Sequence, residues 1–195
     1  MDYKEFDHIK EKLQNSLDST RYEHTLGVMY TAGSLAMAYG QDIRQAMLAG
    51  LLHDCAKCIS LDEMVQWCDK YNFQISEMER GSKNLLHAKA GAVMAEQEYH
   101  INDREILQAI TWHCTGNPDM STLDKMVYIA DFIEPGRKEA KNLDKIRKLA
   151  FDDLDACMAQ ITYDILSYLK SKGYEIDPAT EETYHFYKEC RKEID

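Results

Sequence analysis

Helical periodicity runs through almost all of this 195-residue chain. Apolar residues recur at spacings of three and four, and no run shows the strict apolar–polar alternation of a half-buried strand. Start and stop signals divide the pattern into segments at about 2–17, 20–39, 42–57, 60–70, 83–99, 102–114, 121–134, 143–150, 152–172 and from 178 onward. The sequence therefore predicts an all-α fold, a compact bundle of roughly 8–10 helices.

Capping residues support these segments. The expected caps are Ser19 or Thr20, Ser60 with Glu63, Asn102 with Glu105, Ser121 and Asp177 at helix starts, and Gly40 and Gly173 at helix ends. The chain has only 3 prolines and 9 glycines, which leaves few places for a long linker. We therefore expect residues 1–195 to form a single domain.

Charge and hydropathy argue against several classes of partner. The formal net charge is −11 and the sequence pI is about 5.1, without the clustered Lys and Arg that a nucleic-acid surface needs. No apolar segment approaches the roughly 20 residues that span a bilayer, and the charged N-terminal segment does not resemble a secretory signal. We expect a cytoplasmic protein that binds neither nucleic acid nor membrane. A small phosphorylated ligand stays compatible with the acidic chain if a metal supplies positive charge.

Six cysteines are scattered through the helical pattern. Cys55 and Cys58 form a CxxC pair, but there is no second pair to complete a tetrahedral thiolate zinc site. Reduced cysteines in a cytoplasmic protein are the preferred interpretation, and the role of Cys55 and Cys58 stays open.

Several histidines and aspartates share helix faces with apolar residues. They come from five predicted helices, and they are His24, the pair His53-Asp54 after the apolar run AMLAGLL, His87, His113 and Asp131. A single histidine of this kind is more often a core residue bonded to a backbone carbonyl. A buried carboxylate without a partner costs on the order of several kcal/mol in stability. Two of these six residues are aspartates, so convergence of the six on cations explains the set better. His8 and His100 are assigned no ligand role, and His185 is undecided.

This set would offer four imidazoles and two carboxylates, with no thiolate. Such donors suit divalent first-row metals, among them iron, manganese, cobalt and zinc. Six protein ligands exceed what one catalytic ion uses while keeping a position open, so two metal ions are the better fit. Asp54 is the natural bridge, because its two oxygens can reach both ions while His53 binds one of them.

The order of His24, His53-Asp54 and Asp131 resembles the H…HD…D signature of the HD-domain metal-dependent phosphohydrolases. A finer resemblance is to the YqeK-type branch, the symmetrical diadenosine tetraphosphate hydrolases. The segments that carry it are RYEHTLGV (21–28), AGLLHDCAK (49–57), LLHAKAGA (85–92), WHCTG (112–116) and MSTLDKMVYIADFIEPGR (120–137). Cys114 stands where we expect Thr in this branch, which removes a hydroxyl at that position.

The resemblance implies a compact HD-type bundle with a metal-binding core at about 20–137 and C-terminal helices over 143–193 that pack on it. It also implies two ligand sets: His24, His53, Asp54 and Asp131 for a first ion, and Asp54, His87 and His113 for a second. Iron is the metal that the family suggests. The implied reaction is attack of a metal-activated hydroxide on an inner phosphorus of the tetraphosphate, which releases two nucleoside diphosphates.

Other residues are candidates for contacts with the substrate. Lys57 is the first candidate for a catalytic phosphate contact, although a cation after a helix C-terminus is stabilising by itself. Arg137 can grip a phosphate bidentately, with a solvated loop arginine as the equal alternative, and Arg21 is a weaker candidate. Tyr184 could stack on a base, but core packing is preferred for it.

Two alternatives remain open at this stage. The first is another HD-type phosphohydrolase or phosphodiesterase that acts on nucleotides, and the second is a non-catalytic nucleotide-sensing module. The sequence also leaves open the metal, the preferred base and phosphate-chain length, and whether the protein forms a homodimer.

Overall fold

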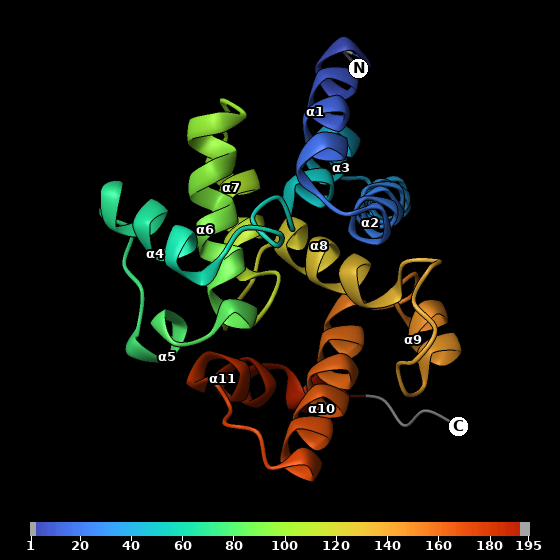
Figure 1. Cartoon of the computed structure of the whole chain (residues 1–195). Coiled ribbons are helices and arrows are strands. Elements are labelled where there is room, and N and C mark those ends of the chain that lie inside the picture. The colour runs from blue at the N-terminus through green and yellow to red at the C-terminus, as the bar shows by residue number, and fades with distance from the viewer. Residues whose placement is uncertain (1–2, 192–195) are drawn as a thin grey trace.

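A computed structural model describes residues 3–191 of the chain. Within this range lie eleven α-helices, one short 3-10 helix and no strand, so the all-α prediction is confirmed (Figure 1). The elements are α1 (Tyr3–Ser16), α2 (Ser19–Ala38), α3 (Ile43–Leu52), α4 (Leu61–Lys70), α5 (Glu77–Arg80), α6 (Lys83–Glu98), α7 (Arg104–Trp112), α8 (Thr122–Ile133), α9 (Leu143–Leu149), α10 (Leu154–Lys172), α11 (Pro178–Tyr187) and η1 (Lys188–Cys190). Residues 2, 192 and 193, which the sequence assigned to terminal helices, lie outside the described range.

Several helices start and end where the sequence predicts. Ser60 and Glu63 form the expected capping box of α4. Asp177 caps α11, whose first residue is Pro178. Gly173 ends α10 at φ 68°, a left-handed conformation that glycine adopts without steric cost.

Other boundaries differ from the prediction. Asp18 rather than Ser19 or Thr20 caps α2, and Asp103 rather than Asn102 caps α7. In both cases an aspartate next to the expected residue accepts the backbone hydrogen bond, because its ionised carboxylate is the stronger acceptor. The short helix α5 was missed, although Ser76 forms a capping box with Glu79 there.

The third helix is shorter than predicted. It ends at Leu52 rather than Lys57, and the chain continues through turns. The N–H of Cys55 bonds to the carbonyl of Leu52 at 3.1 Å, and the N–H of Lys57 bonds to that of Asp54 at 2.9 Å. These three-residue spacings tighten the backbone, so His53 and Asp54 stand at the end of α3 instead of within it.

The helix α8 lies at the centre of the fold, packed against α2, α3, α7 and α10 (Figure 1). Buried apolar side chains from every α-helix except α4 and α5 form one cluster around it, and a second, smaller cluster lies between α4 and α6. Among residues 3–191, no helix combines the length and the apolar composition needed to cross a bilayer.

The helices α2 and α3 approach each other closely at Gly50. A Cβ atom on Gly50 would lie 3.0 Å from Cα of Met29 and 3.1 Å from the carbonyl oxygen of Val28. Glycine therefore lets the two backbones pack in direct contact. This contact sets the separation of His24 on α2 from His53 at the end of α3.

Candidate metal centre

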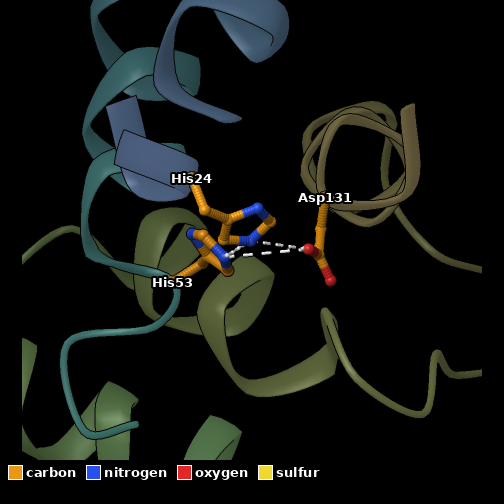
Figure 2. Close-up of side chains that lie close together, drawn as sticks. All are labelled: His24, His53 and Asp131. Carbon is orange, nitrogen blue, oxygen red and sulfur yellow. Dashed lines mark hydrogen bonds and ion pairs between the residues drawn. The ribbon is translucent and has the colours of Figure 1, made fainter. Parts of the chain in front are cut away.

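The first half of the site joins α2, α3 and α8. Nε2 of His24 lies 3.0 Å from Oδ1 of Asp131 and 3.3 Å from Nε2 of His53 (Figure 2). His53 is fully buried at the end of α3, and its Nε2 lies 3.9 Å from the same Asp131 oxygen. Three potential ligand atoms from distant parts of the sequence therefore converge on one point.

The second half joins α6 and α7. His87 on α6 and His113 at the end of α7 are both buried, and their Nε2 atoms lie 3.0 Å apart. Asp54 faces them, with Oδ1 at 3.2 Å from His87 Nε2 and 3.7 Å from His113 Nε2. This second cluster therefore offers two imidazole nitrogens and a carboxylate oxygen.

Asp54 belongs to both halves. Its Oδ2 atom lies 3.5 Å from His53 Nε2 and 3.8 Å from His24 Nε2, while its Oδ1 atom faces His87 and His113. Oδ1 is also buried without a hydrogen-bond partner among the described residues. A buried carboxylate oxygen without a partner is unfavourable unless a cation binds it.

Hydrogen bonds at Nδ1 orient two of the histidines. Nδ1 of His53 donates to the carbonyl of Gly50 at 2.7 Å, and Nδ1 of His113 donates to that of Ile110 at 2.6 Å. Both rings sit one residue past the end of a helix, where the carbonyl three residues earlier lacks its own helical partner. With the proton on Nδ1, each ring presents the lone pair of Nε2 to the site.

Glu134, which the sequence analysis did not select, gives His24 the same orientation. Its Oε1 atom lies 3.2 Å from Nδ1 of His24, and the glutamate is only 4% exposed. Nε2 of His24 lies 3.3 Å from Nε2 of His53 and 3.0 Å from Oδ1 of Asp131. A cation between these three atoms would bind all of them, and the donor types fit a divalent transition metal.

Burial and neighbouring charge set the protonation of the site. Burial lowers the pKa of His87 to about 4, which keeps this ring neutral and able to bind a metal. Burial alone would raise the pKa of Asp54, but the neighbouring imidazoles of His53, His113 and His87 hold it well below its ordinary value. The carboxylate is therefore ionised at neutral pH.

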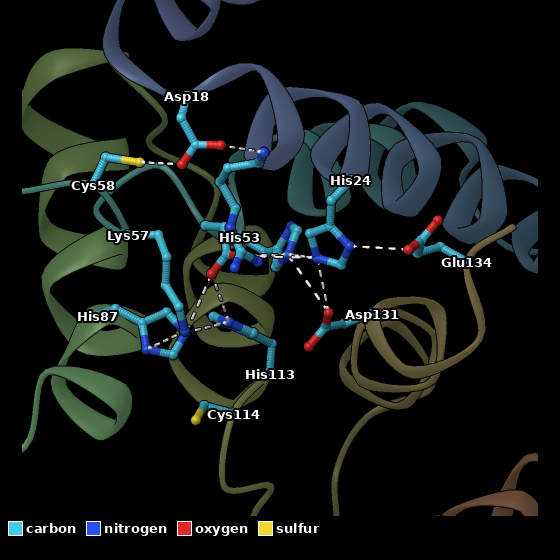
Figure 3. Close-up of polar contacts among 12 residues, drawn as sticks. Asp18, His24, His53, Lys57, Cys58, His87, His113, Cys114, Asp131 and Glu134 are labelled. Carbon is cyan, nitrogen blue, oxygen red and sulfur yellow. Dashed lines mark hydrogen bonds and ion pairs between the residues drawn. The ribbon is translucent and has the colours of Figure 1, made fainter. Parts of the chain in front are cut away.

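Three cationic side chains surround the centre, and Figure 3 shows one of them, Lys57, beside His87. Lys57 Nζ lies 3.1 Å from Nε2 of His87. Arg21 donates to Asp54 Oδ2 at 2.7 Å, and Arg137 donates to Asp131 Oδ1 at 3.0 Å. The structure thus brings Lys57, Arg21 and Arg137 to the edge of the predicted ligand set.

A cavity of about 900 Å³ opens beside the first half of the site. Arg21, His24, Glu134 and Arg137 line it on the side of the ligand set, and the exposed ring of Tyr30 is also part of its wall. It is large enough for a nucleotide, because ligand cavities commonly measure about 300–1,000 Å³.

Other residues considered from the sequence lie elsewhere. Tyr184 packs on Tyr163 of α10 with ring centroids 6.1 Å apart, which supports the preferred role in packing rather than base stacking. His8, His100 and His185 are exposed. Among the six free cysteines, the exposed ones are Cys58 and Cys190. Cys114 donates through its thiol to the carbonyl of Asn84 at 3.1 Å.

Comparisons with known proteins agree with this site. The sequence profile of the HD domain matches residues 21–136. The chain is 38% identical over 169 residues to a Halalkalibacterium halodurans protein named bis(5'-nucleosyl)-tetraphosphatase, symmetrical, which covers 87% of this chain and 89% of the relative. A Bacillus subtilis protein of the same name is 35% identical over 174 residues, 89% of this chain and 92% of the relative.

A solved structure shares the fold. It is a Clostridium acetobutylicum protein described as a predicted HD superfamily hydrolase involved in NAD metabolism, with a TM-score of 0.91 and 36% identity over 95% of this chain and 98% of its own. The resemblance inferred from the motifs is therefore confirmed. The chain belongs to the HD-domain family and, within it, to the family of the symmetrical bis(5'-nucleosyl)-tetraphosphatases.

Proposed function

We propose that this protein hydrolyses diadenosine tetraphosphate, or a related dinucleoside polyphosphate, to two nucleoside diphosphates. The observation that carries the proposal is the position of Asp54 between two histidine groups, with one carboxylate oxygen toward each. Relatives with 35–38% identity over most of the chain bear the name of this activity. Addition of one water across the central anhydride bond of diadenosine tetraphosphate gives two ADP, so the reaction balances without a further reactant.

Two divalent cations are part of the proposal. One would be held by His24, His53, Asp54 and Asp131, and the other by Asp54, His87 and His113. Iron is suggested by the resemblance, while manganese, cobalt and zinc suit the same donors. When bound, such a pair supplies polarisation of phosphate oxygens and a hydroxide nucleophile near neutral pH.

The chain's own cations would bind and orient the phosphates. Lys57 stands next to His87 on the side of the second histidine group. Arg21 and Arg137 each bond a carboxylate of the ligand set and line the adjacent cavity, so both stand between the centre and the space for a nucleotide. Cations fixed by such contacts neutralise phosphate charge without reorganising during the reaction.

Product analysis tests the function directly. Protein purified without oxygen and loaded with Fe²⁺ or Mn²⁺ is incubated with diadenosine tetraphosphate, other nucleotides and cyclic dinucleotides. We expect ADP as the sole product from diadenosine tetraphosphate. Formation of ATP with AMP would contradict symmetrical cleavage, and turnover of another substrate alone would favour a different phosphohydrolase. Binding of nucleotides without turnover would favour a sensing module.

A further inference from the structure

Glu134 is a buried carboxylate at the edge of the candidate metal centre. It is the C-terminal cap residue of α8, three residues after Asp131, and only 4% of it is exposed. Oε1 lies 3.2 Å from Nδ1 of His24 (Figure 3). Oε2 accepts a hydrogen bond from the backbone N–H of Gly136. Both carboxylate oxygens therefore face hydrogen-bond donors.

Two glycines leave room for this carboxylate. A Cβ atom on Gly27, which follows His24 by three residues on α2, would lie 2.7 Å from Glu134 Oε2. A Cβ atom on Gly136 would lie 2.9 Å from the same oxygen. Any side chain at either position would therefore displace the carboxylate, so the glycines at positions 27 and 136 allow Glu134 to lie where it does.

The loop that carries Glu134 is held from α9. Arg147 donates to the carbonyl oxygens of Ile133 and Glu134 at 2.9 Å each, and to that of Arg137 at 3.1 Å. The N–H of Arg137 closes the loop on the carbonyl of Glu134 at 3.0 Å. The backbone of Glu134 is thus fixed independently of its carboxylate, which stays available for His24.

His24 needs such a partner to act as a ligand. For its Nε2 lone pair to face His53 and Asp131, its proton must be on Nδ1. His53 and His113 obtain the same tautomer from the backbone carbonyls of Gly50 and Ile110. His24 lies within α2, in its second turn, where the carbonyls are used by the helix itself, so a side chain has to accept its proton.

We propose that Glu134 is a positioning residue, which fixes the Nδ1–H tautomer and ring orientation of His24 and thereby sets the affinity of the first half of the centre for its cation. The inference rests on the metal centre of the proposed function. A carboxylate behind a ligating histidine also makes the ring a stronger donor, and its loss typically weakens metal binding about 10- to 100-fold.

Glu134→Gln is the sharpest test, because glutamine keeps the size of the side chain but removes its negative charge and one of its two acceptor oxygens. Its one oxygen can accept from Gly136 or from His24, and its amide N–H then opposes the other donor. Glu79→Gln is the matched control. Glu79 is also buried, at 7% exposure, but it pairs with Ser76 and Lys89 in the α5 region, outside the two candidate ligand clusters.

Two readouts apply. Nitrogen-15 NMR of labelled histidine in the proteins loaded with diamagnetic Zn²⁺ reports whether the proton of His24 is on Nδ1, and calorimetric titration of the metal-free proteins with Mn²⁺ reports affinity. We expect Glu134→Gln to shift His24 away from the Nδ1–H form and to weaken one Mn²⁺ site about 10- to 100-fold. Glu79→Gln should change neither. Added Mn²⁺ should restore hydrolysis by Glu134→Gln.

The outcomes separate this inference from the proposed function. An unchanged His24 tautomer and unchanged Mn²⁺ affinity in Glu134→Gln would overturn the inference, as would equal losses in Glu79→Gln. If the wild type binds Mn²⁺ but does not cleave diadenosine tetraphosphate, the function fails while the two readouts still decide the role of Glu134.

Discussion

Asp54 Oδ1 lies 3.2 Å from Nε2 of His87 in the second half of the site, while Oδ2 of the same carboxylate faces His24 and His53 in the first half. One short side chain therefore lies between two groups of candidate ligands that come from five helices. Arg21 fixes this carboxylate through a bond of 2.7 Å to Oδ2. The carboxylate of Asp54 therefore faces both halves of the candidate site.

Asp54→Asn should be the most damaging single substitution. The asparagine amide has the size of the carboxylate but only one oxygen and no negative charge, so it cannot bind a cation in each half of the site. We expect bound metal to fall from about two ions per chain toward none, and hydrolysis to fall about 10³-fold or more. Elemental analysis of anaerobically purified protein and a rate measurement check this. Retention of both ions would show that Asp54 is not shared.

His87→Ala should affect one half only. His87 contacts Asp54 and His113 but lies outside the cluster of His24, His53 and Asp131. We therefore expect about one ion per chain and no measurable hydrolysis, because a two-metal mechanism needs both. His185→Ala, which removes an exposed histidine on α11, is the control and should keep full metal and rate. Full metal content in His87→Ala would argue against a second ion.

Lys57→Met should separate substrate binding from metal binding. The ammonium group lies beside His87, and methionine keeps the length of the side chain without its charge. We expect kcat/KM to fall about 10²-fold or more while the metal content is unchanged. Lys170→Met removes a lysine that is 62% exposed on α10 and should leave both values unchanged. Loss of metal in Lys57→Met would instead indicate a structural role at His87.

Gly50→Ala should destabilise the contact between α2 and α3. The added methyl group would meet backbone atoms of Val28 and Met29, which cannot move aside as a side chain can. We expect a loss of about 1–3 kcal/mol in the free energy of unfolding, measured by urea titration. Gly81→Ala is the control, since its Cβ would meet only ordinary contacts at 3.7 Å. Equal free energies of unfolding for Gly50→Ala and Gly81→Ala would contradict the close approach of α2 and α3 at Gly50.

Much of the fold is readable from local signals. Capping boxes and glycines locate most helices, and apolar periodicity predicts that His24, His87 and Asp131 face inward. The end of α3 was misplaced because the turn at residues 53–58 is compatible with helical periodicity, and only its hydrogen bonds distinguish it.

The role proposed for Glu134 could not be predicted from the sequence, for a different reason. It depends on the approach of the loop after α8 to α2, between residues that are 110 positions apart. Read by itself, Glu134 is an acidic residue before Pro135, a position that is usually solvated. The two glycines that surround it, Gly27 and Gly136, are informative only once the helices are in place.

Anomalous scattering tests the central claim most directly. Crystals of protein purified without oxygen are measured at the absorption edges of iron, manganese, cobalt and zinc. The shared position of Asp54 predicts two peaks about 3.5–4 Å apart, one beside His24, His53 and Asp131 and one beside His87 and His113, with Asp54 between them. A single peak, or two peaks that Asp54 does not join, would contradict the account.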